Sequence, residues 1–441
     1  VDEEVNKPLI ASLPPKGKRA KRVKNKEYDY ETWTMKNGAK VVIKKTDFKE
    51  DEILFHAKSW GGTSLYDQSA DISGDIAASV AMESGLGEYD LTELMKFTSD
   101  KIVRLNLYLN EISEGMRGNS SVEDFETLLQ MIHVAFAKPR VSETAFNSYV
   151  NKQKGVLENQ SLDPQSAWSD TLQTTISNNH QRRRALSMDN IDEANFRTVQ
   201  RIIRQRYSDP NNFTFYFVGN IDLKKAKPLI EKYIGSLQVV TRNENYKDLG
   251  IKSPEGVVEK IVRKGKDDKC MVAMDFHGDM DYNYKNRLEL EALCGIVSTK
   301  LLEEIREKES GVYTIGAYPQ TSNHPNSEYD IVVFYSCDPA RLSQLNDGVF
   351  EEINKLKANG PSDVDLQKAK EKLRREFETN QRENSYWLGK LNELESGDLN
   401  HDELNKFSNY VDNMSSESLK NAANKYFNTN NYIKVVLLPE E

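Results

Sequence analysis

The chain has 441 residues, of which 38% are hydrophobic and 29% are charged. This length predicts two or three domains that each bury a core, and the apolar fraction excludes a wholly disordered chain. The 60 Lys and Arg residues against 69 Asp and Glu residues give a net charge of −9, and seven of the basic residues fall within 16–26. The rest of the chain is therefore strongly acidic, which argues against nucleic acid as the main ligand.

The N-terminal 27 residues precede the first periodic pattern. The chain begins at Val1 and shows no secretory pattern, so we expect a chain processed or excised from a longer one, with its compartment hidden. We interpret residues 1–27 as a solvated basic linker, because Pro14 and Pro15 precede the basic run 16–26 and no aromatic residue interrupts it. The alternatives are a localisation signal or a phosphate-binding patch. No apolar run approaches the roughly 20 residues of a membrane-spanning helix.

Strands and helices alternate irregularly in residues 28–240. Asn37-Gly38 is typical of a hairpin turn because both residues tolerate positive φ, so we expect two strands within 30–46. Alternating apolar residues predict further strands, and apolar residues at helical spacing predict helices. In chain order we expect strand 53–59, helices 72–82 and 91–97, strands 103–109 and 114–120, helices 122–137, 143–159, 166–177 and 193–207, strand 213–218 and helix 223–234.

The same order of elements returns in residues 256–441. We expect strands 256–263 and 271–277, helix 286–307, strands 313–318 and 329–336, helices 340–358, 364–380 and 415–426, and a closing strand 432–438. An internal duplication with a period of about 220 residues explains this order. The sequence therefore predicts two homologous α+β domains, 28–240 and 256–441, each a mainly antiparallel sheet packed with helices. The polar stretch 241–255 is the expected linker.

The sequence contains no complete catalytic motif. Its six histidines are far apart, so no helix carries the His-x-x-x-His pair of a zinc site. A nucleophile elbow, a phosphate-binding loop and a dinucleotide-binding fingerprint are also missing. Cys270, Cys294 and Cys337 are odd in number and widely spaced, so we expect small core residues and neither a disulfide framework nor a thiolate zinc site.

One short segment could offer oxygen and nitrogen ligands. His277, Asp279 and Asp281 follow one another at a spacing of two, and together they could present an imidazole and two carboxylates to a metal ion. We favour a strand end that runs into a polar turn, because short loops collect Asp and Gly for conformational reasons.

The stretch LLEEIREKESGVYTIGAY, residues 301–318, predicts an amphipathic helix, a glycine stop at Gly311 and a strand. One interpretation places Arg306 against the negative helix C-terminus and leaves Tyr313 as an ordinary strand aromatic. The other places a guanidinium and a phenol side by side at a helix-to-strand corner. Such a pair can donate hydrogen bonds to a peptide carbonyl or to a developing oxyanion. The residues alone favour the first interpretation.

This corner resembles the Arg-Glu-x-x-Gly-x-x-Tyr element of the pitrilysin/insulysin (insulinase) family of zinc peptidases, in the last domain of their non-catalytic half. Residues 36–55, followed by Trp60-Gly-Gly-Thr-Ser, are similar to the start of the third domain in long bacterial members. The resemblance implies an insulinase-type, LuxS-metallohydrolase-like fold, with 28–240 and 256–441 as the third and fourth domains of a full enzyme. Gly311 lies one position later than in many relatives, which puts the local conformation of the corner in doubt.

The catalytic half of such enzymes carries His-x-x-Glu-His, whose histidines bind zinc. In this chain the corresponding helix, about 72–85, has alanine, serine and valine in those places. The resemblance therefore implies no metal ligands here and zinc in a partner half. It carries over Arg306 and Tyr313 as catalytic and substrate-binding residues, which would contact the substrate carbonyl or oxyanion in trans to the zinc half.

The predicted function is that of the substrate-binding, chamber-forming half of a zinc endopeptidase or oligopeptidase, inactive alone. The alternative is a non-catalytic homologue that acts as a structural or peptide-binding scaffold subunit, and a self-sufficient enzyme is disfavoured. The implied partners are peptides and an N-terminal zinc-bearing half, in the same polypeptide or in a separate subunit; homodimerisation is left open. A bacterial periplasmic location is favoured, with the cytoplasm as the alternative.

Overall fold

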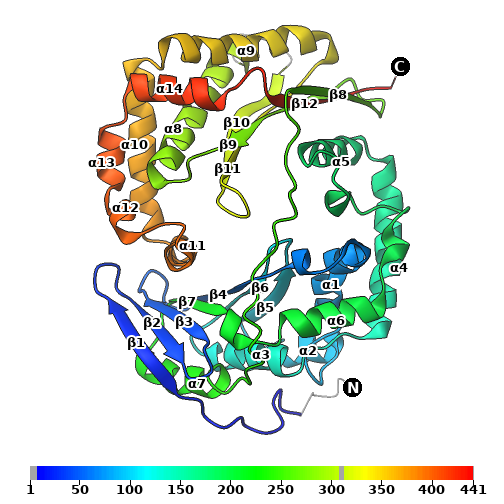
Figure 1. Cartoon of the computed structure of the whole chain (residues 1–441), viewed down its shortest axis with the longest axis vertical. Coiled ribbons are helices and arrows are strands. Elements are labelled where there is room, and N and C mark those ends of the chain that lie inside the picture. The colour runs from blue at the N-terminus through cyan, green and yellow to red at the C-terminus, as the bar shows by residue number, and fades with distance from the viewer. Residues whose placement is uncertain (1–6, 307–311, 441) are drawn as a thin grey trace. The chain divides into compact units, whose positions relative to one another are not determined.

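The computed structural model describes residues 7–306 and 312–440, except for the side chain of Arg306 (Figure 1). The chain forms two compact units, each built from separate stretches of sequence. Unit 1 consists of Val1–Val156, Leu186–Leu249 and Asn380–Asn392, and unit 2 consists of Leu157–Ala185, Gly250–Thr379 and Glu393–Glu441. Each unit thus covers most of one range expected from the sequence, 28–240 or 256–441. It lacks one segment of that range and includes one segment from the other.

Unit 1 is built on a seven-stranded sheet. Its strand order is β1-β2-β3-β7-β4-β6-β5, and its only parallel neighbours among the described strands are β3 and β7. The predicted hairpin at Asn37-Gly38 is confirmed, because β2 and β3 pair antiparallel and Gly38 has a φ of 86°. The strands are β1 Arg19–Asn25, β2 Tyr30–Met35, β3 Lys40–Lys45, β4 Ile53–Trp60, β5 Val103–Leu109, β6 Ser113–Ser120 and β7 Thr214–Gly219.

Helices cover one face of this sheet and form the main core with it. Stacked and tilted rings of Phe55, Phe215, Phe217 and Phe136 fill its centre. The helices are α1 Asp71–Glu83, α2 Leu91–Phe97, α3 Phe125–Ala137, α6 Phe196–Arg206 and α7 Leu223–Tyr233, and α4 Glu143–Leu162 runs from unit 1 into unit 2. The four helices predicted before residue 160, together with helices 193–207 and 223–234, fall on these elements.

The basic N-terminal segment is partly strand rather than linker. Arg19–Asn25 forms β1, the edge strand that pairs antiparallel with β2. Arg22 donates to the Glu31 carboxylate through Nε at 2.8 Å, and the Arg19 guanidinium lies 5.2 Å from the Trp33 ring centroid. The interpretation of 16–26 as solvated linker is therefore wrong for Arg19–Asn25. Exposed basic residues on an edge strand also oppose pairing with another chain.

Unit 2 repeats the topology of unit 1. Its five-stranded sheet has the order β10-β11-β9-β12-β8, which matches β5-β6-β4-β7-β3, and β8 and β12 are parallel as β3 and β7 are. The duplicated order of elements predicted from the sequence is thus present in the sheets. The strands are β8 Val257–Arg263, β9 Cys270–Asp279, β10 Val312–Ser322, β11 Glu328–Cys337 and β12 Tyr432–Leu438.

The helices of unit 2 include short elements that the sequence did not predict. The π-helical turn η6, Leu302–Arg306, follows α8 directly, so the predicted helix 286–307 ends differently from expectation. None of the described helices combines the length and apolar character needed to cross a bilayer. The helices are α5 Pro164–Ile176, α8 Tyr284–Leu301, α9 Leu342–Asn359, α10 Asp363–Asn380, α12 His401–Asn405, α13 Phe407–Asp412 and α14 Ser416–Tyr426; α11 Asn384–Ser396 spans both units and, like α12 and α13, was missed.

Each sheet packs on its second face against a helix whose sequence lies in the other half of the chain. Helix α5 packs on the second face of the unit 2 sheet, where Trp168 is buried and its Nε1 donates to the Val435 carbonyl at 2.9 Å. The first half of α11 packs on the second face of the unit 1 sheet through Trp387 and Leu391. The two tryptophans lie about 220 residues apart, the period of the duplication. The exchange is therefore reciprocal.

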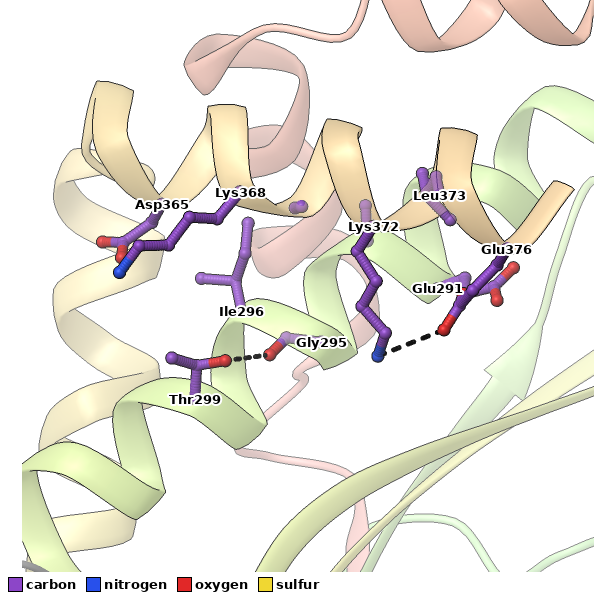
Figure 2. A pocket seen from close by; sticks show the side chains of 11 residues that line it. Glu291, Gly295, Ile296, Thr299, Asp365, Lys368, Lys372, Leu373 and Glu376 are labelled. Carbon is purple, nitrogen blue, oxygen red and sulfur yellow. Dashed lines mark hydrogen bonds and ion pairs between the residues drawn. The ribbon is translucent and has the colours of Figure 1, made fainter. Parts of the chain in front are cut away.

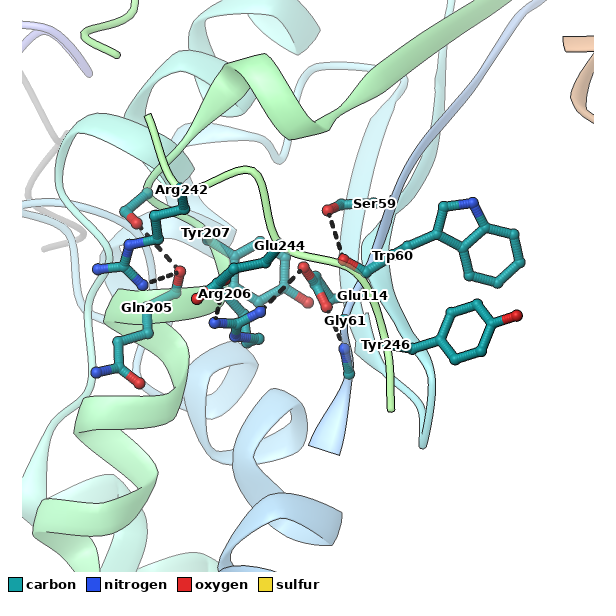
Figure 3. A network of polar contacts seen from close by, with 12 residues as sticks. Ser59, Trp60, Gly61, Glu114, Gln205, Arg206, Tyr207, Arg242, Glu244 and Tyr246 are labelled. Atoms are coloured by element: carbon teal, nitrogen blue, oxygen red, sulfur yellow. Dashed lines mark hydrogen bonds and ion pairs between the residues drawn. The ribbon is translucent and has the colours of Figure 1, made fainter. Parts of the chain in front are cut away.

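A buried ion network fastens the start of the expected linker to unit 1 (Figure 3). Arg206 is 4% exposed, and its guanidinium lies 2.7 Å from the Glu244 carboxylate and 3.7 Å from that of Glu114. Its Nε also donates to the Tyr66 hydroxyl at 3.0 Å. Glu114 accepts a 2.6 Å hydrogen bond from the Gly62 amide. Arg206 is thus an ion-pair partner of both carboxylates, with Glu244 at the shorter distance.

Burial raises the pKa of Glu114 to about 7, although the Arg206 charge opposes the shift. An unfolded glutamate titrates near 4.3, so the folded state binds more protons between about pH 4.5 and pH 7. The free energy of unfolding should therefore fall, by about 2 kcal/mol from this group, as the pH rises from 5 to 8. Urea unfolding of wild type and Glu114→Gln at both values measures this difference. Glu123→Gln, on an exposed side chain, should keep the wild-type slope, and an unchanged slope in Glu114→Gln would contradict the assignment.

Candidate functional site

The predicted helix-to-strand corner lies at the start of β10. The backbone of Arg306 ends the π-helical turn η6, and such turns are frequent at functional sites. Tyr313 is the second residue of β10, its side chain is 54% exposed, and Lys269 Nζ lies 5.7 Å from its ring centroid. The Arg306 side chain and residues 307–311, with the predicted stop at Gly311, lie outside the described residues. Their juxtaposition with Tyr313 therefore stays a prediction.

A groove of about 680 Å³ runs along the edge strand next to this corner. Helix α8 forms one wall with Arg287, Glu291 and Ser298, and β10 forms the other from Ile315 onward. Strand β10 ends the five-stranded sheet, so one of its sides has no neighbouring strand in the described structure. An edge strand beside an open groove is the arrangement to which an extended peptide can add.

The middle of this edge is blocked. The Ala317 amide donates to Ser298 Oγ at 2.8 Å, and this hydroxyl donates to the Ala317 carbonyl at 3.1 Å. The backbone polar groups of Ala317 therefore point away from β11. The same holds for the backbone polar groups of Ile315 and Pro319, two positions to either side. Pro319 has no N–H to offer. An added peptide could therefore pair with β10 at Ile315, close to Tyr313.

Unit 1 has an equivalent block on its own edge strand. The Leu107 amide of β5 donates to the sulfur of Met82, on α1, at 3.3 Å. In both units, a side chain from the helix beside the edge strand thus occupies one backbone position of that strand. A side chain in this place restricts pairing with another chain.

A smaller cavity of about 140 Å³ lies between α8 and α10 and shares part of the groove lining (Figure 2). Ile296 and Leu373 contribute apolar surface, and Lys372 forms an ion pair with Glu376 at 3.8 Å. Lys372 also lines the larger groove. This side of α8 therefore offers apolar contacts and charges of both signs, as binding of a peptide with mixed side chains requires.

The side chains of α1, the helix that corresponds to the zinc-binding helix of the resembled family, do not suit a metal ion. In α1, Ile76, Ala77 and Val80 are buried in the apolar core. Within 7–306 and 312–440, no group of three or more His, Cys, Asp or Glu side chains is placed to hold a metal ion.

The imidazole of His277 contacts other groups of the protein, and it does not form a common metal site with Asp279 and Asp281. Its Nε2 lies 3.0 Å from the Pro254 carbonyl, and its Nδ1 lies 3.4 Å from the Asp275 carboxylate. Strand β9 ends at Asp279, as the favoured strand-to-turn interpretation expects. Asp281 instead contacts the Asn283 side chain at 3.0 Å.

The sequence search missed a buried acidic group beside this histidine. Asp275 is fully buried, and Asp330 pairs with His277 across β9 and β11. Burial and the Asp275 charge raise the pKa of Asp330 to about 7. Burial alone would lower the pKa of His277, but the Asp275 carboxylate raises it above its usual value. The alternation of Asp275 and His277 within an apolar strand was the available signal.

The two sheets of matching topology, each packed with helices, define a fold class of duplicated α+β units. Residues 197–373 match the family model described as the peptidase M16 inactive domain. The chain thus carries an inactive domain of the M16 peptidases and is homologous to PqqL-like zinc proteases. The resemblance to the pitrilysin/insulysin family stated from the sequence is confirmed.

Two relatives illustrate this homology. The zinc protease PQQL-like of Arabidopsis thaliana is 24% identical over 409 residues, 88% of this chain and 40% of the relative. The probable zinc protease PqqL of Haemophilus influenzae is 24% identical over 374 residues, 81% of this chain and 39% of the relative. The chain thus spans about two fifths of the length of these relatives.

Solved structures confirm the predicted fold class. The periplasmic protease PqqL from Escherichia coli superposes with a TM-score of 0.84 at 20% identity, covering 99% of this chain and 48% of that one. The peptidase M16 inactive domain from Pseudomonas fluorescens superposes with a TM-score of 0.74 at 15% identity, covering 93% of this chain and 98% of that one. Both are similar in fold over nearly the whole chain.

Proposed function

We propose that the chain is the substrate-binding, chamber-forming half of a zinc-dependent endopeptidase or oligopeptidase. The observation that carries this proposal is the exposed Tyr313 at the open end of an edge strand and beside a groove, in a homologue of zinc proteases. Zinc would be held by an N-terminal half, in the same polypeptide or in a partner subunit. The relative from Escherichia coli is described as periplasmic, and we propose the same compartment here.

Peptides would bind to this half by pairing with β10 at Ile315, where the edge is not blocked by Ser298 or Pro319. This pairing would bring a peptide carbonyl next to Tyr313. The phenol of Tyr313 and the guanidinium of Arg306 would then donate hydrogen bonds to that carbonyl and to the oxyanion that develops from it. Both groups act as donors only, so this half orients the substrate and stabilises charge without taking up a proton.

Reconstitution tests the proposal. The zinc-bearing half alone should cleave a quenched fluorogenic peptide poorly, and addition of this chain should raise kcat/KM. Arg306→Ala and Tyr313→Phe should each lower the restored kcat by roughly 10²-fold, because each removes one donor to the oxyanion. Arg263→Ala, at the opposite edge of the same sheet, serves as the matched control and should restore full activity.

A failure to raise activity would favour the alternative function, a scaffold subunit. Restored activity that neither Arg306→Ala nor Tyr313→Phe reduces would retain the chamber role and remove these two residues from the site. Circular dichroism of each variant separates either result from loss of folding.

A further inference from the structure

Two cysteines that are far apart in the sequence lie side by side in unit 2. Cys270 begins β9 and Cys337 ends β11, and the antiparallel register places the two residues directly opposite each other. Both are free thiols, fully buried, and their sulfur atoms are 2.9 Å apart. The expectation that the cysteines are small core residues is confirmed, and strand register brings two of them, 67 residues apart in the sequence, into contact.

The backbone geometry suits a covalent link. Directly opposite residues in an antiparallel pair have Cα atoms about 4.5–5.5 Å apart, within the roughly 4.4–6.8 Å range of disulfides. Their side chains also lie on the same face of the sheet. An S–S bond of about 2.05 Å requires the sulfurs to approach by only roughly 0.9 Å. We propose that Cys270 and Cys337 form a cross-strand disulfide when the chain folds in an oxidising environment.

The link forms by thiol–disulfide exchange with an external disulfide, such as glutathione disulfide or a protein oxidase. One of the two cysteines, written here as Cys270, loses its proton and attacks as the thiolate. It bonds to one sulfur of the external disulfide and expels the other as a thiolate. Cys337, on losing its proton, then attacks Cys270 Sγ and releases the second external thiolate. Two electrons pass to the external disulfide, and its two thiolates take up the two protons.

Burial sets when this exchange occurs. The sulfurs are inaccessible once β9 and β11 have paired, so the external disulfide reacts with the chain during folding, and the finished link is then shielded from reductants. Cys294 is also buried, but it lies on α8 and belongs to neither strand. It stays a thiol and provides an internal reference.

The link would stiffen the end of the sheet that carries Tyr313. Cys337 pairs with Val312 on its other side, and Lys269, which precedes Cys270, lies over the Tyr313 ring. The disulfide itself does not depend on the proposed peptidase function. Only its effect on substrate contacts at Tyr313 rests on that function.

Mass spectrometry of the full chain tests the link. The chain is folded with glutathione disulfide, denatured and treated with N-ethylmaleimide, with and without prior reduction. One alkylated cysteine without reduction and three after it, with a cross-linked peptide that joins Cys270 to Cys337, are expected. Three alkylated cysteines without reduction, or a link that includes Cys294, would overturn the proposal.

Variants and hydrogen exchange test the consequence. Cys294→Ser should keep the cross-link and Cys337→Ser should lose it. The oxidised chain should have a Tm about 5–15 °C above that of the reduced chain, because the link constrains the unfolded state. Amides of residues 312–316 should exchange more slowly after oxidation, while those of β5 in unit 1 should not change. Equal Tm and equal exchange in the two states would refute stiffening of the sheet end.

Discussion

Trp168→Ala is expected to lower the free energy of unfolding of unit 2 by about 3–5 kcal/mol. The indole is buried against Met271, Ile433 and Val435, and its N–H satisfies the Val435 carbonyl. Alanine would leave a cavity between α5 and the sheet and would remove the hydrogen bond to the Val435 carbonyl. Urea unfolding followed by circular dichroism measures the change, with α5 expected to detach from the sheet first.

The matched control is Gln173→Ala, on the exposed side of the same helix. This substitution should change stability by less than about 0.5 kcal/mol, because it removes no buried contact. Trp168→Phe should fall between the two, since it keeps most of the ring but loses the hydrogen bond. Equal effects of Trp168→Ala and Gln173→Ala would mean that α5 does not stabilise the sheet.

Arg206→Met is expected to cost unit 1 about 3–5 kcal/mol, because it leaves Glu114 buried without its cationic partner. Above pH 7 the cost should be largest, since Glu114 is then ionised in a site that burial makes unfavourable for charge. The same loss should release the linker residues near Glu244 from unit 1. Thermal unfolding at pH 6 and pH 8 and hydrogen exchange of residues 241–248 provide the two measurements.

A second substitution separates charge from packing. Arg206→Met combined with Glu114→Gln should recover part of the lost stability, because no unpaired charge then remains buried. The two changes should therefore be non-additive, as expected for residues in direct contact. Strict additivity at pH 8 would show that the Glu114 carboxylate does not depend on Arg206.

Local patterns predicted most of the elements. The hairpin at Asn37-Gly38 depends on a backbone conformation that only a few residues tolerate. The apolar residues within 71–83 and 432–438 form patterns that predict a helix and a strand. Strand β1 was missed because its composition indicates solvation, whereas antiparallel pairing with β2 and the contact of Arg22 with Glu31 hold it in the sheet. For α11, the helical spacing of Trp387 and Leu391 was present in the sequence and was overlooked.

Candidate site residues came from the sequence only where a motif is local. Arg306 and Tyr313 lie within eight positions of the sequence, so a family pattern can single them out, and their role stays a prediction. The block of Ala317 by Ser298 and the pairing of Cys270 with Cys337 both depend on how distant segments meet. Period and composition contain no information about strand register between segments 67 residues apart. Only the folded sheet provides it.

The reciprocal exchange of α5 and α11 affects how the chain can fold as it leaves the ribosome. The unit 1 sheet is complete once β7 has been made, but its apolar second face around Val42 and Tyr216 waits for Trp387. At roughly 5–20 residues per second, that delay is on the order of 10–30 s. During this time the second face of the unit 1 sheet is not yet covered by α11. Helix α5 has no unit 2 sheet to pack against. Neither repeat can therefore finish folding until both helices and both sheets have been made.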